Sequence, residues 1–102
     1  MQAKPRLEWR LQARVDLLEI VAYIADDNLE PAQELKDEIE AKAAKLPDHP
    51  KRYKPSTRVK GMRELVARSN YIVLYRETPQ LVEVVNVLYA RRQWPPLKGD
   101  KP

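Results

Sequence analysis

The order of apolar and polar residues predicts a meander of three strands in the second half of the chain. Three β-prone runs, at residues 62–67, 71–76 and 81–89, lie between short gaps rich in turn-forming residues. Strands joined by such tight connections are typical of an antiparallel meander. We expect residues 71–76 to form the central strand, because they are apolar on both faces. In the gap at residues 68–70, Asn70 tolerates a left-handed backbone, which suits a tight connection.

The first half of the chain predicts a short strand followed by a helix. Residues 5–9 alternate roughly between polar and apolar, so that Leu7 and Trp9 share one face of a strand. From residue 12 to about residue 27, polar side chains recur at helical spacing. The apolar arc they leave is too wide for a helix with one buried face. We therefore expect this helix to be covered on two sides, by the sheet and by a second helix.

A second helix is predicted from residue 31 to residue 46. Its apolar residues form a narrow stripe, which indicates a helix on the outside of the domain. The stripe consists of Ala32, Leu35, Ile39, Ala43 and Leu46. Two interpretations of its start remain open: Asn28 caps the helix, or Pro31 occupies its first position.

Together these elements predict an α+β fold with an N-terminal strand, a two-helix antiparallel hairpin and a three-stranded antiparallel meander packed on the helices. A chain of 102 residues has room for one domain, which we place at residues 1–102, with an ordered core at about 5–96 and a loose tail at 97–102. The pattern does not determine where the first strand joins the sheet. No apolar run is long enough to span a membrane or to form a signal peptide, so we expect a cytoplasmic protein.

Charge is divided unequally between the two halves of the chain. Residues 1–50 contain seven Lys/Arg against eleven Asp/Glu, whereas residues 51–102 contain twelve against four. This segregation predicts a positive face that attracts an anionic partner, either nucleic acid or an acidic protein. A merely solvated basic surface is the alternative.

The basic residues begin in a long loop between the second helix and the meander. Pro47, Pro50 and Pro55 prevent regular structure there, and no acidic residue occurs between Asp48 and Glu64. The loop is a candidate nucleic-acid contact, although an ordinary solvated loop fits equally well. The candidate residues are Lys51, Arg52, Lys54, Arg58 and Lys60, with Tyr53 among them.

The meander and the segment after it add candidates for binding a partner. They are Arg63, Arg76, Tyr89, Arg91, Arg92 and Trp94. Arg76 has a second interpretation, as a structural salt bridge to Glu64 or Glu83 on a neighbouring strand.

The residue inventory excludes several kinds of chemistry. There is no cysteine, and His49 is the only histidine, so we expect no metal site. The two glycines, Gly61 and Gly99, cannot form a phosphate-binding loop, and no serine or cysteine nucleophile has a plausible histidine base. We expect no cofactor. Any catalysis would depend on Tyr, Lys, Arg or a carboxylate, as in a metal-free ribonuclease.

Four segments carry a resemblance to a known family. They read DLLEIVAYI at 16–24, GMRELV at 61–66, YIVLYR at 71–76 and VLYARRQWP at 87–95. In this order they resemble the RelE/ParE superfamily of toxins from bacterial type II toxin–antitoxin modules, over residues 6–95. The resemblance implies a growth-inhibiting toxin that is neutralised by a cognate antitoxin, with operator DNA bound only through the antitoxin.

Within the superfamily, this chain departs from the RelE branch. Those members are ribosome-dependent mRNA endonucleases with cations on the second strand and an arginine on the central strand. The corresponding positions here fall near Met62 and Glu64 and on Ile72, and only Arg91 matches. The chain is more similar to ParE-type toxins, which bind DNA gyrase and have no catalytic set.

Three hypotheses follow for the target. The leading hypothesis is a non-enzymatic toxin directed at DNA gyrase. The alternative is a RelE-like enzyme acting on the ribosome and mRNA with a rebuilt catalytic set of Lys60, Arg63, Tyr89 and Arg91. The third is a nucleic-acid-binding module without toxicity, whose binding would weaken steeply with salt.

Overall fold

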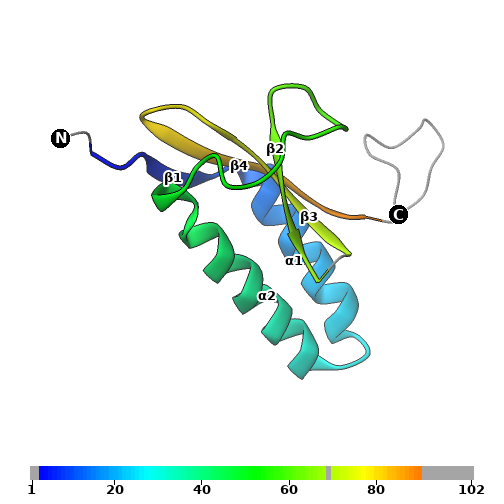
Figure 1. Cartoon of the computed structure of the whole chain (residues 1–102). Helices are drawn as coiled ribbons and strands as arrows, with labels where there is room; N and C mark the ends of the chain where they lie inside the picture. The colour runs from blue at the N-terminus through cyan, green and yellow to red at the C-terminus, as the bar shows by residue number, and fades with distance from the viewer. Residues whose placement is uncertain (1–2, 69, 91–102) are drawn as a thin grey trace.

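The computed structural model describes residues 3–68 and 70–90 and has the predicted α+β architecture (Figure 1). Four strands and two long helices follow one another in the expected order. The elements are β1 (Arg6–Trp9), α1 (Leu11–Ala25), α2 (Leu29–Ala44), the 3₁₀ turn η1 (Leu46–Asp48), β2 (Arg63–Ala67), β3 (Tyr71–Glu77) and β4 (Leu81–Tyr89). The predicted tail at residues 97–102 lies outside the described residues.

The strands form one sheet in the order β1-β4-β3-β2. The meander is antiparallel as predicted, and β1 adds to its far edge in parallel with β4, with Trp9 opposite Val84. The sequence left this position of β1 open. β3 is flanked on both sides, so it is an inner strand of the sheet.

Both helices lie on the same side of the sheet and run antiparallel to each other (Figure 1). α1 packs against both α2 and β4, as expected for a helix covered on two sides. The cover is nevertheless incomplete, because Leu11 is 77% exposed and Leu18 is 58% exposed. The wide apolar arc of α1 therefore extends beyond the surface that the domain itself buries.

Asn28 begins α2, which decides between the two interpretations of its start. Its side-chain oxygen accepts a hydrogen bond from the backbone N–H of Glu30 at 3.2 Å, and Pro31 lies inside the first turn. The predicted apolar stripe is buried throughout. It consists of Ala32, Leu35, Ile39 and Ala43 in α2 and Leu46 in η1.

The sheet has an apolar cluster on each face. The main core lies between the sheet and the helices and includes Val73 and Tyr75 of β3. A second cluster on the opposite face consists of Ile72, Leu74 and Leu88, against which Val59 and Met62 of the loop before β2 are packed. Burial of β3 on both faces confirms the prediction of a central strand, and the long loop supplies the second cover.

The turn between β2 and β3 contains a residue with a left-handed backbone, Arg68, with φ of 54°. The backbone N–H of Asn70 donates a hydrogen bond to the carbonyl of Ala67 in the same turn, at 3.3 Å. The Arg68 side chain forms an ion pair with Glu38 of α2 at 3.0 Å, which connects the turn to the helix.

Asp16 attaches α1 to the part of β4 that β1 does not reach. β1 accompanies β4 only as far as Val84, so the next backbone groups of β4 have no strand partner on that side. One carboxylate oxygen of Asp16 accepts hydrogen bonds from the backbone N–H of Val87 and from the side chain of Asn86, both at 3.0 Å. A helix side chain thus satisfies a donor of the sheet edge.

Within residues 3–68 and 70–90, neither helix has the length and hydropathy of a membrane span.

Replacing Asp16 with Ala should destabilise the domain. The substitution leaves the Val87 N–H without its acceptor, which we expect to lower the free energy of unfolding by about 1–3 kcal/mol. Urea denaturation of the purified protein measures this change. Asp27→Ala removes an equal charge from an exposed position after α1 and serves as the control. Equal midpoints for the two variants would contradict the role assigned to Asp16.

Candidate functional site

The basic loop is held against the sheet by a small polar network around Ser56. The Ser56 hydroxyl donates to the Glu64 carboxylate at 2.6 Å and accepts from the backbone N–H groups of Arg58 and Val59, at 3.0 and 3.1 Å. Two backbone bonds, Ser56 N–H to Met62 at 2.7 Å and Glu64 N–H to Lys54 at 3.0 Å, complete the attachment. The loop therefore has a defined conformation.

The predicted nucleic-acid contacts of this loop differ in whether they are paired with a carboxylate. Arg58 lies 3.7 Å from the Glu64 carboxylate. Among the described residues, no carboxylate lies within 4.0 Å of the other four predicted contact residues. These four exposed residues are Lys51, Arg52, Lys54 and Lys60. Their positive charge is thus available to an anionic partner.

The Arg63 side chain is held by contacts within the fold. Its guanidinium pairs with Glu77 of β3 at 3.2 Å and donates to the backbone carbonyl of Tyr53 at 2.7 Å. The side chain is 21% exposed. Arg63 therefore connects the loop to the sheet, and little of its guanidinium remains for a partner.

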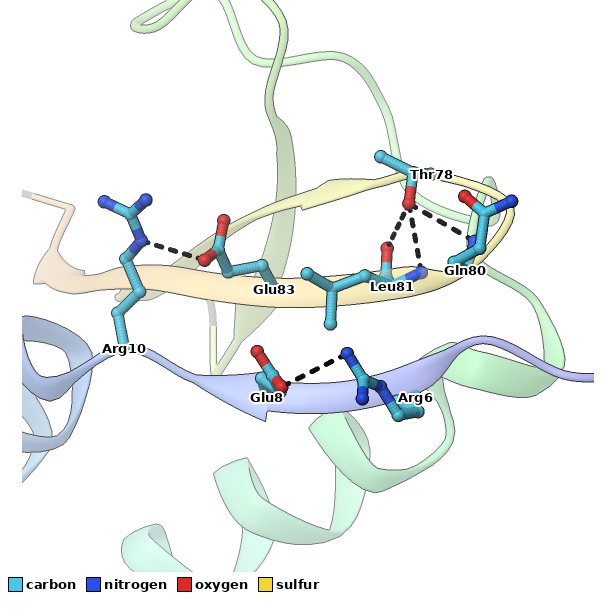
Figure 2. Close-up of polar contacts among 7 residues, drawn as sticks. All are labelled: Arg6, Glu8, Arg10, Thr78, Gln80, Leu81 and Glu83. Carbon is cyan, nitrogen blue, oxygen red and sulfur yellow. Dashed lines mark hydrogen bonds and ion pairs between the residues drawn. The ribbon is translucent and has the colours of Figure 1, made fainter.

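Arg76 lies on the opposite face of the sheet from Arg63, in a cluster centred on Glu83. The Glu83 carboxylate pairs with Arg76 at 2.7 Å and with Arg10 at 2.9 Å, the latter contact being visible in Figure 2. Hydrogen bonds from Arg10 and then Arg76 hold the pKa of Glu83 below its ordinary value. Of the two salt-bridge partners considered for Arg76, the structure has Glu83. One carboxylate facing two guanidinium groups leaves this cluster positive, and the Arg76 side chain is still 45% exposed.

Thr78 holds the turn between β3 and β4, next to this cluster. Its hydroxyl accepts from the backbone N–H of Leu81 at 3.0 Å and of Gln80 at 3.3 Å (Figure 2). On the neighbouring β1, Arg6 pairs with Glu8 at 3.5 Å, and both side chains are exposed (Figure 2).

Tyr89 lies at the far end of the sheet from Arg63. Its ring packs on Tyr71, with 5.4 Å between ring centroids, whereas Arg63 is paired with Tyr75. Tyr71 and Tyr75 are four positions apart along β3, which corresponds to about 13 Å at 3.3 Å per residue. The structure therefore does not bring Arg63 and Tyr89 together as one catalytic set. Arg91, Arg92 and Trp94 lie outside the described residues.

Two surfaces were not identified from the sequence. One is an exposed apolar stripe on α1, formed by Leu11, Val15 and Leu18, which we call the α1 stripe. The excessive width of the apolar arc was its signal. The other is a basic hollow where α2 ends, lined by Lys42, Lys45, Leu46, His49, Arg52 and Tyr53. Its two lysines belong to residues 1–50, whose net charge is negative, so the charge distribution along the chain did not identify them as part of a basic site.

No group of three His, Cys, Asp or Glu side chains that could hold a metal ion occurs in the part of the chain that the structure describes.

Comparison with known proteins places the chain in a family. Residues 7–94 match the model of the ParE toxin of the type II toxin–antitoxin system parDE. The chain is 36% identical over 94 residues to Y4kP, a provisionally named toxin of Sinorhizobium fredii (strain NGR234), covering 91% of this chain and 96% of that protein.

Solved structures agree on the fold. A chain of the chromosomal ParDE toxin–antitoxin system from P. aeruginosa matches with a TM-score of 0.75 and 21% identity, over 86% of this chain and 98% of its own. A chain of the toxin–antitoxin complex RelBE2 from Mycobacterium tuberculosis matches with a TM-score of 0.54 and 22% identity, over 87% and 94%. The family predicted from the four sequence segments is therefore confirmed, and this chain belongs to the ParE toxin family of type II toxin–antitoxin systems.

Proposed function

We propose that this toxin inhibits growth by binding DNA gyrase without catalysis, and that a cognate antitoxin neutralises it by direct contact. It acts in the cytoplasm, where its target is found, and reaches operator DNA as part of the complex with its antitoxin. Family membership supports the general role. The choice of gyrase over the ribosome depends on the environment of Glu64 and Ile72.

The environment of these two residues is the observation that carries the proposal. In the resembling ribonucleases, cations occupy the corresponding positions. Here Ile72 is 4% exposed in the apolar cluster beneath the loop, and the Glu64 carboxylate is hydrogen-bonded to Ser56. Neither side chain can stabilise the negative charge that develops on a phosphate during cleavage. Both residues serve instead to attach the loop.

The candidate catalytic set is also unsuited to proton transfer. Arg63 is engaged by Glu77, and Tyr89 lies at the other end of the sheet. Groups that transfer protons during cleavage must lie within hydrogen-bonding reach of the same phosphate, and these two side chains do not meet at one point.

The α1 stripe is the surface to which we propose that the antitoxin binds. Leu11, Val15 and Leu18 follow at helical spacing and lie on one face of α1. Such an apolar surface, uncovered in a single domain, is typical of a protein interface. The structural relatives are named as parts of toxin–antitoxin systems. We therefore propose that an antitoxin helix binds the α1 stripe through an apolar face of its own.

The target can be tested with purified components. We expect the toxin to block DNA supercoiling by gyrase and to leave protein synthesis in a cell-free system unaffected. Supercoiling is followed on agarose gels, and mRNA integrity by primer extension. Cleavage of mRNA in the ribosomal A site together with unaffected supercoiling would refute the gyrase proposal in favour of the ribonuclease alternative.

The antitoxin surface can be tested with Leu18→Glu. Burying one Leu side chain contributes about 1.5–3 kcal/mol, so losing it should weaken antitoxin binding about 10- to 150-fold. Isothermal titration calorimetry with the cognate antitoxin measures the affinity, and circular dichroism checks the fold. Tyr23→Glu is the control, because Tyr23 is 84% exposed on α1 but outside the stripe. If both variants lost affinity equally, the stripe would not be the binding surface.

A further inference from the structure

The basic hollow lies where α2 ends and the chain turns through η1 into the loop. It has a volume of about 160 Å³. Its lining consists of Lys42 of α2, Lys45 at the C-cap of α2, Leu46 of η1, and His49, Arg52 and Tyr53 of the loop.

The walls of the hollow are held in place by the core. The hydroxyl of buried Tyr75 donates to the carbonyl of Pro50 at 2.8 Å. The Tyr53 ring packs edge-on against Tyr75 at 6.4 Å, and the Tyr53 carbonyl accepts from Arg63. The backbone N–H of Arg52 donates to the carbonyl of His49 at 3.1 Å. A ligand would therefore meet a largely preorganised surface.

The charge of the hollow is positive. None of its lining residues is acidic, and no carboxylate of the described residues lies within 4.0 Å of Lys45 or Arg52. Lys42 has a long ion pair with Glu38, at 3.5 Å. The C-terminal end of α2 contributes a partial negative charge of roughly half an electron, which offsets less than one of the three cations.

The side chains suit a phosphate group in particular. A guanidinium can bind two phosphate oxygens at once, and lysines add mobile point charges. The Arg52 guanidinium lies 5.9 Å from the centre of the Tyr53 ring, which limits where it can point. Lys51 and Lys54, the sequence neighbours of Arg52 and Tyr53, are also exposed and supply further positive charge for phosphates beside the first. Contacts of cations with phosphates carry no information about base sequence.

We propose that this hollow binds the phosphodiester backbone of DNA, so that the toxin itself contacts DNA independently of base sequence and without the antitoxin. The inference goes beyond the proposed function, because it requires neither gyrase nor the ribosome.

The test uses the purified toxin without antitoxin and a fluorescein-labelled 20-base-pair duplex. Fluorescence anisotropy measures affinity between 50 and 400 mM NaCl. Each phosphate contact contributes about 0.9 to the slope of log affinity against log salt, so Lys45→Gln/Arg52→Gln should reduce the slope by about 1.8. We also expect a drop in affinity of at least tenfold at 50 mM salt.

The control is Arg14→Gln/Lys36→Gln, which removes the same charge from residues that do not line the hollow. This variant should keep most of the wild-type affinity. Urea denaturation verifies that both double variants are folded. Equal losses in the two variants would show attraction by net charge only and would overturn the proposal. The proposal would also be overturned if the toxin did not bind the duplex at 50 mM salt. This holds even if the toxin then bound inorganic phosphate.

Discussion

The structure depends on covering both apolar faces of β3. The two helices lie on one side of the sheet only, so Ile72 and Leu74 on the other side would face water without a second cover. The loop before β2 supplies it with Val59 and Met62. Because the loop completes the core, contacts with the core determine its conformation. On one face of the sheet the contact is the hydrogen bond of Ser56 with Glu64, and on the other it is that of Tyr75 with Pro50.

This constraint explains the distribution of charge on the surface. Within the described residues, the three carboxylates of the second half of the chain are all used in contacts of the fold: Glu64 holds the loop, Glu77 pairs with Arg63, and Glu83 joins Arg10 and Arg76. The remaining cations of the loop face solvent around it. The molecule thus has a basic surface at the loop and an apolar surface on α1, which suit two different partners.

Much of the fold could be predicted from the sequence, because the periodicity of each element reports which side is buried. The apolar stripe of α2 and the apolar residues on both faces of β3 were correctly predicted to be buried. The place of β1 was not predictable, since four residues of alternating pattern fit either edge of a sheet. The left-handed conformation of Arg68 was not foreseen, because the residue type alone gives no reason for it.

The candidate site was less predictable, because charge along the chain does not show which cations are already paired. Arg63 and Arg76 were both candidates for binding a partner, yet they lie on opposite faces of the sheet and each has a carboxylate partner. The basic hollow combines lysines of α2 with a loop arginine, which only the tertiary fold brings together. Conversely, the departure at Glu64 and Ile72 was visible in the sequence, and the structure explains it by the attachment of the loop.

Hydrogen exchange in the loop tests this account most directly. Two backbone N–H groups of the loop are suitable probes: that of Ser56 donates to the carbonyl of Met62, and that of Val59 donates to the Ser56 hydroxyl. If the loop is part of the core, these amides should exchange as slowly as those of β2, and their protection should be lost together with that of the sheet in denaturant. Exchange of both amides at the rate of an unfolded chain, while β2 remains protected, would show that the loop is not held by the core and would contradict the account.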